Sequence, residues 1–196
     1  MNFKELNALA EEQTGKSLFT GALNVSIIGL RSPRKDDQVS DRYQDKIIFT
    51  WQQNEDEDSR IILEFPATTY AGLKYYNNPI NKSGTACLMS GFHKHLWEVG
   101  RHRNYKALRQ VSDARVLRDN NRDDKNNPEP EIQTGKYYIN LHRANYKGNN
   151  KTVESYSAGC QVLLAHSFVF LSLMKELERI VNETGWDKYS YFLLDL

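Results

Sequence analysis

The sequence predicts an α+β fold that is mostly β, built as a sandwich or partly closed barrel with one helix at each end of the chain. Most of the chain consists of short runs that are rich in β-branched and aromatic residues and are separated by polar turns. Two segments instead have apolar residues at helical spacing. The 196 residues are 39% hydrophobic, which is enough for one sizeable core.

The first predicted helix covers residues 3–12, and Gly15 is expected to end it. Its apolar residues recur at helical spacing: Phe3, Leu6, Leu9 and Ala10. We interpret residues 1–15 as an N-terminal helical appendage and residues 16–196 as a single domain.

The predicted strands share β-branched or aromatic side chains and the length of ordinary strands. They cover residues 22–32, 45–53, 60–70, 84–90, 95–102, 114–119, 135–144 and 159–164. The polar stretches between them are expected to be exposed loops.

A second helix is predicted over about 167–183, with Ser167 as its N-cap and Gly185 as its end. One stripe of this helix is expected to face the core: Phe168, Leu171, Met174, Leu177, Ile180 and Val181. Residues 189–196 then predict a final strand.

Charge and hydropathy argue against nucleic-acid and membrane-spanning functions. The net charge is +1, with 26 basic and 25 acidic residues, so the overall field does not attract nucleic acid. Residues 1–16 contain no apolar segment typical of a signal peptide, and no apolar run approaches the ~20 residues that span a bilayer. Two cysteines do not form a disulfide framework. We therefore expect synthesis in a cytoplasm without a signal peptide.

A cysteine and a histidine lie at the edges of neighbouring predicted strands. His142 ends one strand, and Cys160 starts the next after a polar loop. An imidazole that accepts the thiol proton would make Cys160 a nucleophile. Gly159 permits a turn that aims the amides of Gly159 and Cys160 at a developing oxyanion, while Ser157 is placed to orient the imidazole or to donate to the substrate. The alternative is a buried core cysteine beside an edge histidine.

The segment 134–164 resembles the catalytic segment of the L,D-transpeptidase family. The matching residues keep the order and similar spacing of that motif: Thr134, Gly135, Tyr137, Ile139, His142, Ser157, Gly159 and Cys160. The resemblance implies a mostly β catalytic fold acting on peptidoglycan stem peptides. It also implies that Cys160 is acylated, that His142 is the base and later the acid, and that the Gly159 and Cys160 amides form the oxyanion hole.

The segment departs from the family motif in three places. Arg143 stands where the family prefers glycine, and Ala158 replaces a histidine. Gln161 and Val162 occupy the stretch where the family has an arginine that, by the resemblance, would help hold a substrate carboxylate. Arg143 is a candidate to supply that guanidinium.

We expect four residues to contact the substrate: Arg143, His102, Gln161 and Tyr138. For His102 the expected role is that of a second imidazole that polarises a carbonyl or binds a carboxylate. Its alternative is a structural hydrogen bond at the end of a strand.

A broader resemblance extends over nearly the whole chain. Residues 62–91, 99–110 and 116–124, together with the segment 134–164, are similar to uncharacterised proteins encoded largely by bacteriophages and prophages. This likeness implies a phage protein, either a wall-degrading enzyme or a virion component.

The combined prediction is a phage-type cysteine enzyme that processes peptidoglycan through an acyl-enzyme, with hydrolysis favoured over transpeptidation. It would be made in the bacterial host cytoplasm and act at the cell wall after release or from the virion. Its chemistry needs no metal or organic cofactor. The alternative is a non-catalytic virion or tail-associated protein that retains the fold and contacts other virion proteins.

Overall fold

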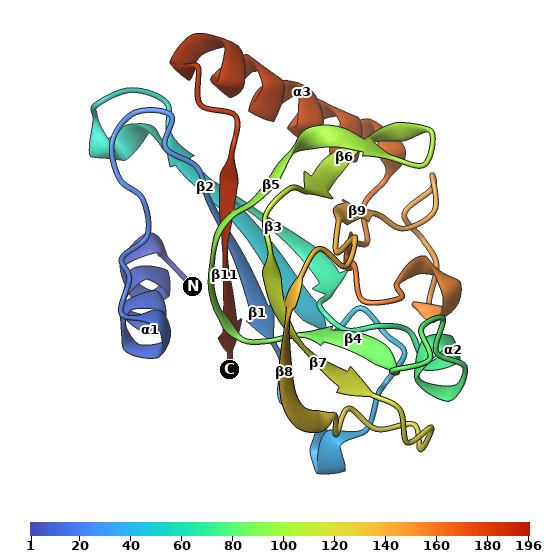
Figure 1. Ribbon diagram of the computed structural model, residues 1–196. Coiled ribbons are helices and arrows are strands. Elements are labelled where there is room, and N and C mark those ends of the chain that lie inside the picture. Colours follow the sequence, from blue (N-terminus) through green and yellow to red (C-terminus); the bar gives the residue numbers. More distant parts are fainter.

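The computed structural model describes residues 1–196, and its main body is a closed eight-stranded barrel (Figure 1). The barrel strands are β1 (Ser26–Arg31), β2 (Asp45–Gln52), β3 (Arg60–Thr68), β5 (Gly91–His102), β6 (Tyr105–Gln110), β9 (Leu141–Arg143), β10 (Gln161–Leu163) and β11 (Tyr189–Asp195). Their order around the barrel is β1-β11-β5-β6-β9-β10-β3-β2, and β2 pairs back onto β1. The predicted mostly β, α+β class is confirmed, and the barrel is fully closed.

A smaller three-stranded sheet lies beside the barrel. It has the order β4-β7-β8, with β4 (Thr85–Leu88), β7 (Ala114–Asp119) and β8 (Glu129–Gly135). The helices are α1 (Phe3–Thr14), α2 (Leu73–Asn77) and α3 (Ser167–Thr184), and short 3₁₀ turns occupy Lys35–Asp37, Glu57–Ser59 and Glu154–Tyr156. None of the α-helices combines the length and apolar character needed to cross a bilayer.

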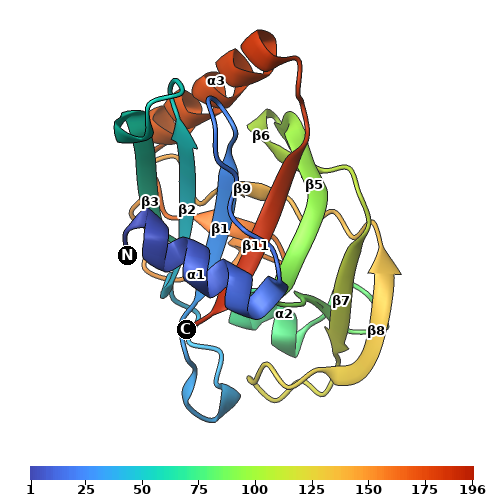
Figure 2. The same cartoon turned by 90° about the vertical axis from the view of Figure 1, so that its left-hand side faces the viewer.

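The helix α1 forms as predicted and packs on the outside of the barrel. Asn2 and Glu5 form a reciprocal capping box at its start, and Gly15 ends it with a φ of 64°. Leu6 and Ala10 are fully buried against apolar side chains of β1, β2 and β11. Figure 2 shows the helix lying across these strands. The segment expected as an appendage therefore covers one face of the sheet.

The helix α3 covers one end of the barrel, and its buried stripe matches the prediction at Met174, Leu177 and Ile180 but not at Phe168 and Leu171. The buried residues are Phe170, Leu173, Met174, Leu177 and Ile180. Phe168 and Leu171, which were expected in the core, are 74% and 39% exposed. The N-cap is His166, whose side chain accepts from the Phe168 N–H, and not Ser167. Gly185 ends the helix as predicted.

The largest departure among the strands concerns residues 135–144. Only Leu141–Arg143 forms a barrel strand, because the chain turns at Tyr138, whose φ is 59°. The strands β6 and β8 were not predicted. Most residues of β8 are exposed and polar, so its sequence lacks the alternation that marks a half-buried strand.

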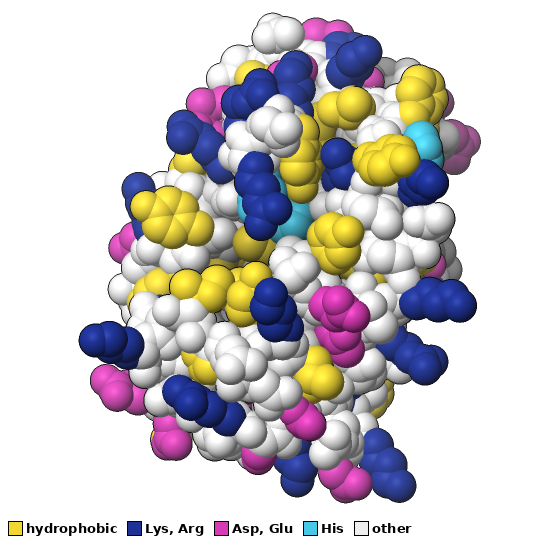
Figure 3. Space-filling view, turned by 90° about the vertical axis from the view of Figure 1, so that its right-hand side faces the viewer, with side chains coloured by type: hydrophobic (Ala, Val, Ile, Leu, Met, Phe, Trp, Pro, Cys, Tyr) yellow, Lys and Arg dark blue, Asp and Glu magenta, His cyan; other side chains and the backbone are white.

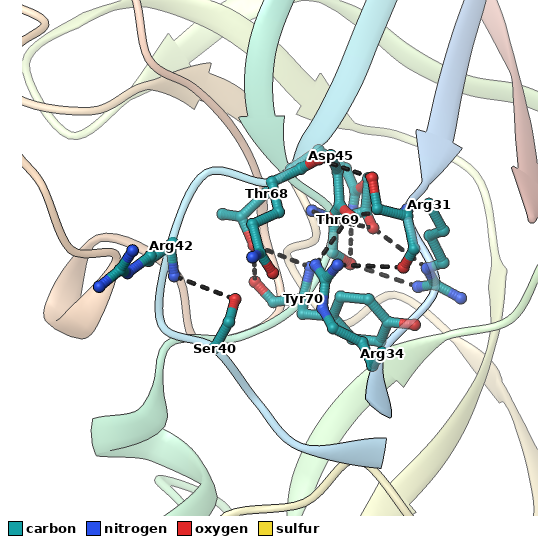
Figure 4. A network of polar contacts seen from close by, with 11 residues as sticks. Arg31, Arg34, Ser40, Arg42, Asp45, Thr68, Thr69 and Tyr70 are labelled. Carbon is teal, nitrogen blue, oxygen red and sulfur yellow. Dashed lines mark hydrogen bonds and ion pairs between the residues drawn. The ribbon is translucent and has the colours of Figure 1, made fainter. Parts of the chain in front are cut away.

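A buried polar network joins the barrel to the smaller sheet (Figure 4). The carboxylate of Asp45 accepts from the Thr69 N–H at 2.8 Å and pairs with Arg34 at 2.8 Å. Arg31 donates to the carbonyl oxygens of Thr69 and, at 2.7 Å, Leu88 on β4. These contacts satisfy charges that would otherwise be costly to bury, and they fix the β1, β2 and β3 ends relative to β4.

Candidate functional site

The strands β9 and β10 lie side by side in parallel and bring His142 close to Cys160. Gln161 pairs with Leu141, and Val162 pairs with His142. The thiol precedes β10 directly, so it lies at the same edge of the sheet as the turn before β9. The connection between them is a crossover between parallel strands.

The Cys160 thiol meets two imidazoles at this edge. The sulfur and one nitrogen from each ring of His102 and His142 all lie within 4.8 Å of one another. The thiol also donates to the Tyr138 carbonyl oxygen at 3.4 Å. The pair singled out in the sequence is therefore together in space, and His102 joins it from the end of β5.

Hydrogen bonding defines which nitrogen of His142 is free. Its Nδ1 lies 2.8 Å from the Arg143 carbonyl oxygen, which can only accept, so Nδ1 carries the proton. The Tyr105 hydroxyl lies 3.2 Å from the same nitrogen and donates to the same carbonyl at 3.3 Å. Nε2 is buried and has no hydrogen-bond partner. This leaves an unprotonated, unoccupied nitrogen on a ring that is only 2% exposed.

The His102 ring stacks on the His142 ring and covers one of its faces. The ring centroids are 3.9 Å apart and the planes differ by 11°. The Asn140 amide holds His102 by donating to its Nδ1 at 3.2 Å. The orientation of Asn140 is set in turn because its Oδ1 accepts from the Gln110 N–H. The expected contact between His102 and a substrate remains a prediction.

Burial keeps both partners of the Cys/His pair neutral at rest. It lowers the pKa of His142 to about 3, with the neighbouring His102 adding to the effect. It raises the pKa of the Cys160 thiol to about 11, although a hydrogen bond from the Asn140 backbone and the charge of Arg103 oppose this. The resting site therefore holds a thiol and an imidazole, not a thiolate and an imidazolium.

The turn before Cys160 differs from the predicted oxyanion hole. Gly159 has a φ of 126°, and a Cβ there would lie 2.8 Å from the Ala86 carbonyl oxygen, so only glycine fits. The Gly159 N–H donates to the Ser157 hydroxyl at 3.2 Å and is not free for a substrate. The Cys160 N–H makes no hydrogen bond and is the remaining donor of this turn.

Ser157 shapes this turn and does not contact the imidazole. Its side chain is fully buried, and the hydroxyl donates to the Cys160 carbonyl oxygen at 2.7 Å. No hydrogen bond joins Ser157 to His142, and the expected contact between Ser157 and a substrate remains a prediction.

Gln161, which was expected to contact the substrate, is fully buried. Its Oε1 accepts from the Tyr191 hydroxyl at 2.8 Å, and its Nε2 donates to the Thr69 carbonyl. Gln161 thus links the site to the network of Figure 4.

The other two predicted substrate residues differ in their relation to the groove that contains Cys160. The Tyr138 ring is 82% exposed and lines the groove that contains Cys160. The Arg143 guanidinium lies over the Tyr105 ring, 4.4 Å from its centroid, and donates to the Ala144 carbonyl. Arg143 is not among the residues that line the groove.

A groove of about 420 Å³ leads to Cys160 from the smaller sheet. It is lined mainly by apolar and aromatic side chains, among them Ile80, Tyr137 and Tyr138, and its charged residues are Arg118 and Lys136. No acidic residue lines it. Figure 3 looks at this side of the molecule, where histidine lies in the middle of the face with basic and hydrophobic side chains around it. The lining is suited to an extended ligand that carries negative charge.

Several residues of the site carried no usable signal in the sequence. Tyr105, Asn140 and Arg103 are ordinary turn or strand residues until the fold places them beside the two imidazoles. Gln110 has a similar hidden role, because its Oε1 accepts from the Tyr137 and Ile139 N–H groups and so holds the turn that carries Tyr138.

Comparison of the chain with protein-family models, with curated proteins and with solved structures gives no match.

Proposed function

We propose that this chain is a cysteine hydrolase that forms an acyl-enzyme on Cys160 while processing peptidoglycan stem peptides. The single observation that carries the proposal is the close approach of the Cys160 sulfur to the His142 ring, whose Nε2 is buried and has no hydrogen-bond partner. A thiol at the end of a groove and a proton acceptor fixed in one tautomer are the two parts that nucleophilic cysteine catalysis requires.

The neutral resting pair determines the order of the steps. As the sulfur attacks the substrate carbonyl carbon, its proton moves to Nε2 of His142, and the Arg143 carbonyl stabilises the imidazolium through Nδ1. The Cys160 N–H donates to the developing oxyanion. Collapse breaks the amide C–N bond, and the imidazolium protonates the leaving amine. Water then cleaves the thioester, with His142 accepting its proton, and the carboxylic acid product and the free thiol result.

The groove supports a peptide substrate with free carboxylates. The Arg118 guanidinium is half-buried and is held by the Gly84 carbonyl and the Gln133 side chain, yet it has no carboxylate partner. Lys136 is exposed on the neighbouring turn. A cation that lacks an internal counter-ion gains most from an anionic ligand. In this proposal Arg118 and Lys136, and not Arg143, hold the carboxylate of the substrate.

The test is digestion of purified muropeptides, followed by mass spectrometry. Wild type should release shortened peptides and carry a transient acyl mass on Cys160. Cys160→Ala should abolish both, whereas Cys87→Ala should retain both, because Cys87 lies outside the groove. Intact muropeptides with wild type, together with no acyl mass, would refute the proposal.

A second candidate is a non-catalytic virion or tail-associated protein. The observation that favours it is the Ser157 hydroxyl on the Gly159 N–H, which removes one of the two expected oxyanion donors. This candidate predicts that muropeptides stay intact and that the chain is found in purified phage particles. Under either candidate, we propose that the protein reaches the wall after release from the host or as part of the virion.

A further inference from the structure

We propose that the cluster of Cys160, His142 and His102 is also a binding site for a thiophilic divalent cation, specifically Zn²⁺. The ion would occupy the nucleophile itself and so hold the site in a closed, unreactive form. Ion binding does not depend on the proposed function, whereas the competition with acylation does rest on it.

The donor atoms are already gathered. One nitrogen of each imidazole and the Cys160 sulfur lie within 4.8 Å of one another, and no other group of histidine, cysteine and acidic side chains in the molecule is as close. Thiolate and imidazole are the ligands that Zn²⁺ takes in proteins, and three protein ligands with one open position are typical of a site that exchanges with solvent. The set therefore matches zinc better than calcium or magnesium, which prefer oxygen.

His142 is already oriented as a metal ligand. Its Nε2 is buried without a partner, although an unpaired polar atom in that position is unfavourable. Its Nδ1 donates to the Arg143 carbonyl at 2.8 Å, which is the second contact that metal-bound histidines usually make. A ring that is 2% exposed and held in this tautomer can move little, so the ion has to come to it.

His102 is the ligand that has to adjust. Zinc bonds of about 2.0–2.3 Å require the donor atoms to be roughly 3.5 Å apart, so the cluster must tighten by roughly 1 Å. Because the two rings are stacked nearly parallel, their nitrogen lone pairs do not point toward one common metal position. His102 is only half-buried at the end of β5, and one hydrogen bond from Asn140 retains it. Turning this ring out of the stack gives the convergence that the ion needs.

Binding consumes the reactive form of Cys160. The thiol S–H bond breaks, the sulfur bonds to Zn²⁺ as a thiolate, and the proton leaves to solvent. A metal-bound sulfur lone pair is not available to attack a carbonyl. The ion would therefore protect Cys160 from alkylation and from acylation, and a chelator would reverse both effects.

The experiment uses Co²⁺ as a spectroscopic probe, followed by Zn²⁺ in competition. The full-length, metal-free wild type should bind one Co²⁺ and show the near-ultraviolet absorption of a cobalt–thiolate bond. Zn²⁺ should displace this signal and block iodoacetamide at Cys160, and excess EDTA should restore the reaction. Cys160→Ser should lose the thiolate absorption, and His102→Ala should weaken Co²⁺ binding by at least about a hundredfold.

Matched controls separate this site from the remaining cysteine and histidines. Cys87→Ala and His95→Ala should bind Co²⁺ as wild type does, because neither residue belongs to the cluster. Circular dichroism checks that each variant is folded, and His102→Gln substitutes if the alanine variant is not. Co²⁺ binding without thiolate absorption, or binding that is unchanged in a folded His102 variant, would overturn the proposal. Metal binding with intact muropeptides would retain it and refute only the hydrolase function.

Discussion

The two free cysteines of this chain have similar pKa values and very different neighbours. Burial raises the pKa of both Cys87 and Cys160 to about 11. Cys87, on β4, packs in a small apolar cluster, with the Tyr76 hydroxyl 3.6 Å from its sulfur. Cys160 stands at the end of a groove with two imidazoles beside it. The comparison teaches that a proton acceptor and an approach route, not the resting pKa, distinguish a candidate nucleophile from a core thiol.

The sharpest way to break this comparison is to alkylate both thiols in the folded protein, with a chelator present. Cys160 should react with iodoacetamide at least about a hundredfold faster than Cys87, because general-base assistance contributes ~10²–10⁴-fold and the reagent can enter the groove. Peptide mapping by mass spectrometry measures the two rates in one sample. Equal rates would remove the distinction.

Replacing the base should change the pH dependence of the Cys160 reaction. Burial lowers the pKa of His142 to about 3, so its ring is neutral and able to accept a proton at any higher pH. The wild-type rate should therefore be nearly flat from about pH 5 to 8. In His142→Ala the rate should be about a hundredfold lower at pH 7 and rise about tenfold per pH unit toward the thiol pKa. His95→Ala is the control. A wild-type profile as steep as that of His142→Ala would contradict the role of the base.

The turn that presents Cys160 offers a test by matched glycine substitutions. Gly159→Ala should lower the free energy of unfolding by about 1–3 kcal/mol and slow alkylation of Cys160, because the new Cβ meets the Ala86 carbonyl at a φ of 126°. Gly15 also has a positive φ, but a Cβ added there would have no atom within 4 Å, so Gly15→Ala is the matched control. It should cost about 1 kcal/mol and leave the alkylation rate unchanged. Urea denaturation and the iodoacetamide assay measure the two effects.

The smallest effects should come from removing the hydroxyl beside each site. Tyr105→Phe deletes a hydrogen bond to the Arg143 carbonyl oxygen, the group that fixes the His142 tautomer. Tyr76→Phe deletes the contact between the Tyr76 hydroxyl and the Cys87 sulfur. Each loss is worth about 1 kcal/mol. Tyr105→Phe should slow alkylation of Cys160 about fivefold, whereas Tyr76→Phe should only lower stability. If Tyr76→Phe changes Cys160 reactivity, the two regions are coupled and the comparison fails.

Apolar content and periodicity predicted the elements that are well buried and missed those that are mostly exposed. The helix α1 follows its periodicity, the almost continuously buried strands β1 and β2 follow their content of β-branched and aromatic residues, and Gly15 and Gly185 end the helices as predicted. The exposed strand β8 has no such pattern and was missed. The stripe of α3 was predicted correctly at Met174, Leu177 and Ile180 but not at Phe168 and Leu171. Apolar residues lie on both faces of this helix, and only packing against the barrel decides which face is buried.

The sequence predicted the Cys160–His142 pair but not the contacts that surround it. Two residues near a motif end up inside the protein: Ser157 supports the turn, and Gln161 bonds to Tyr191. The groove cation Arg118 lies on β7, far from the motif in the chain, and only the packing of the smaller sheet beside β10 brings it near. A contact between residues so far apart in the chain leaves no local pattern in the sequence from which it could be predicted.

Because β9 and β10 pair in parallel, the spacing of His142 and Cys160 does not depend on the length of the chain that connects them. The register of the two strands sets Val162 beside His142 and Gln161 beside Leu141, so it fixes the position of Cys160 relative to His142, whatever path the crossover takes. The exposed polar tip at Asn149 and Lys151 is thus a place where extra residues can be inserted without disturbing the geometry below. The fold in this way leaves a site at which a second binding module or an affinity tag can be grafted beside an unaltered Cys160–His142 pair.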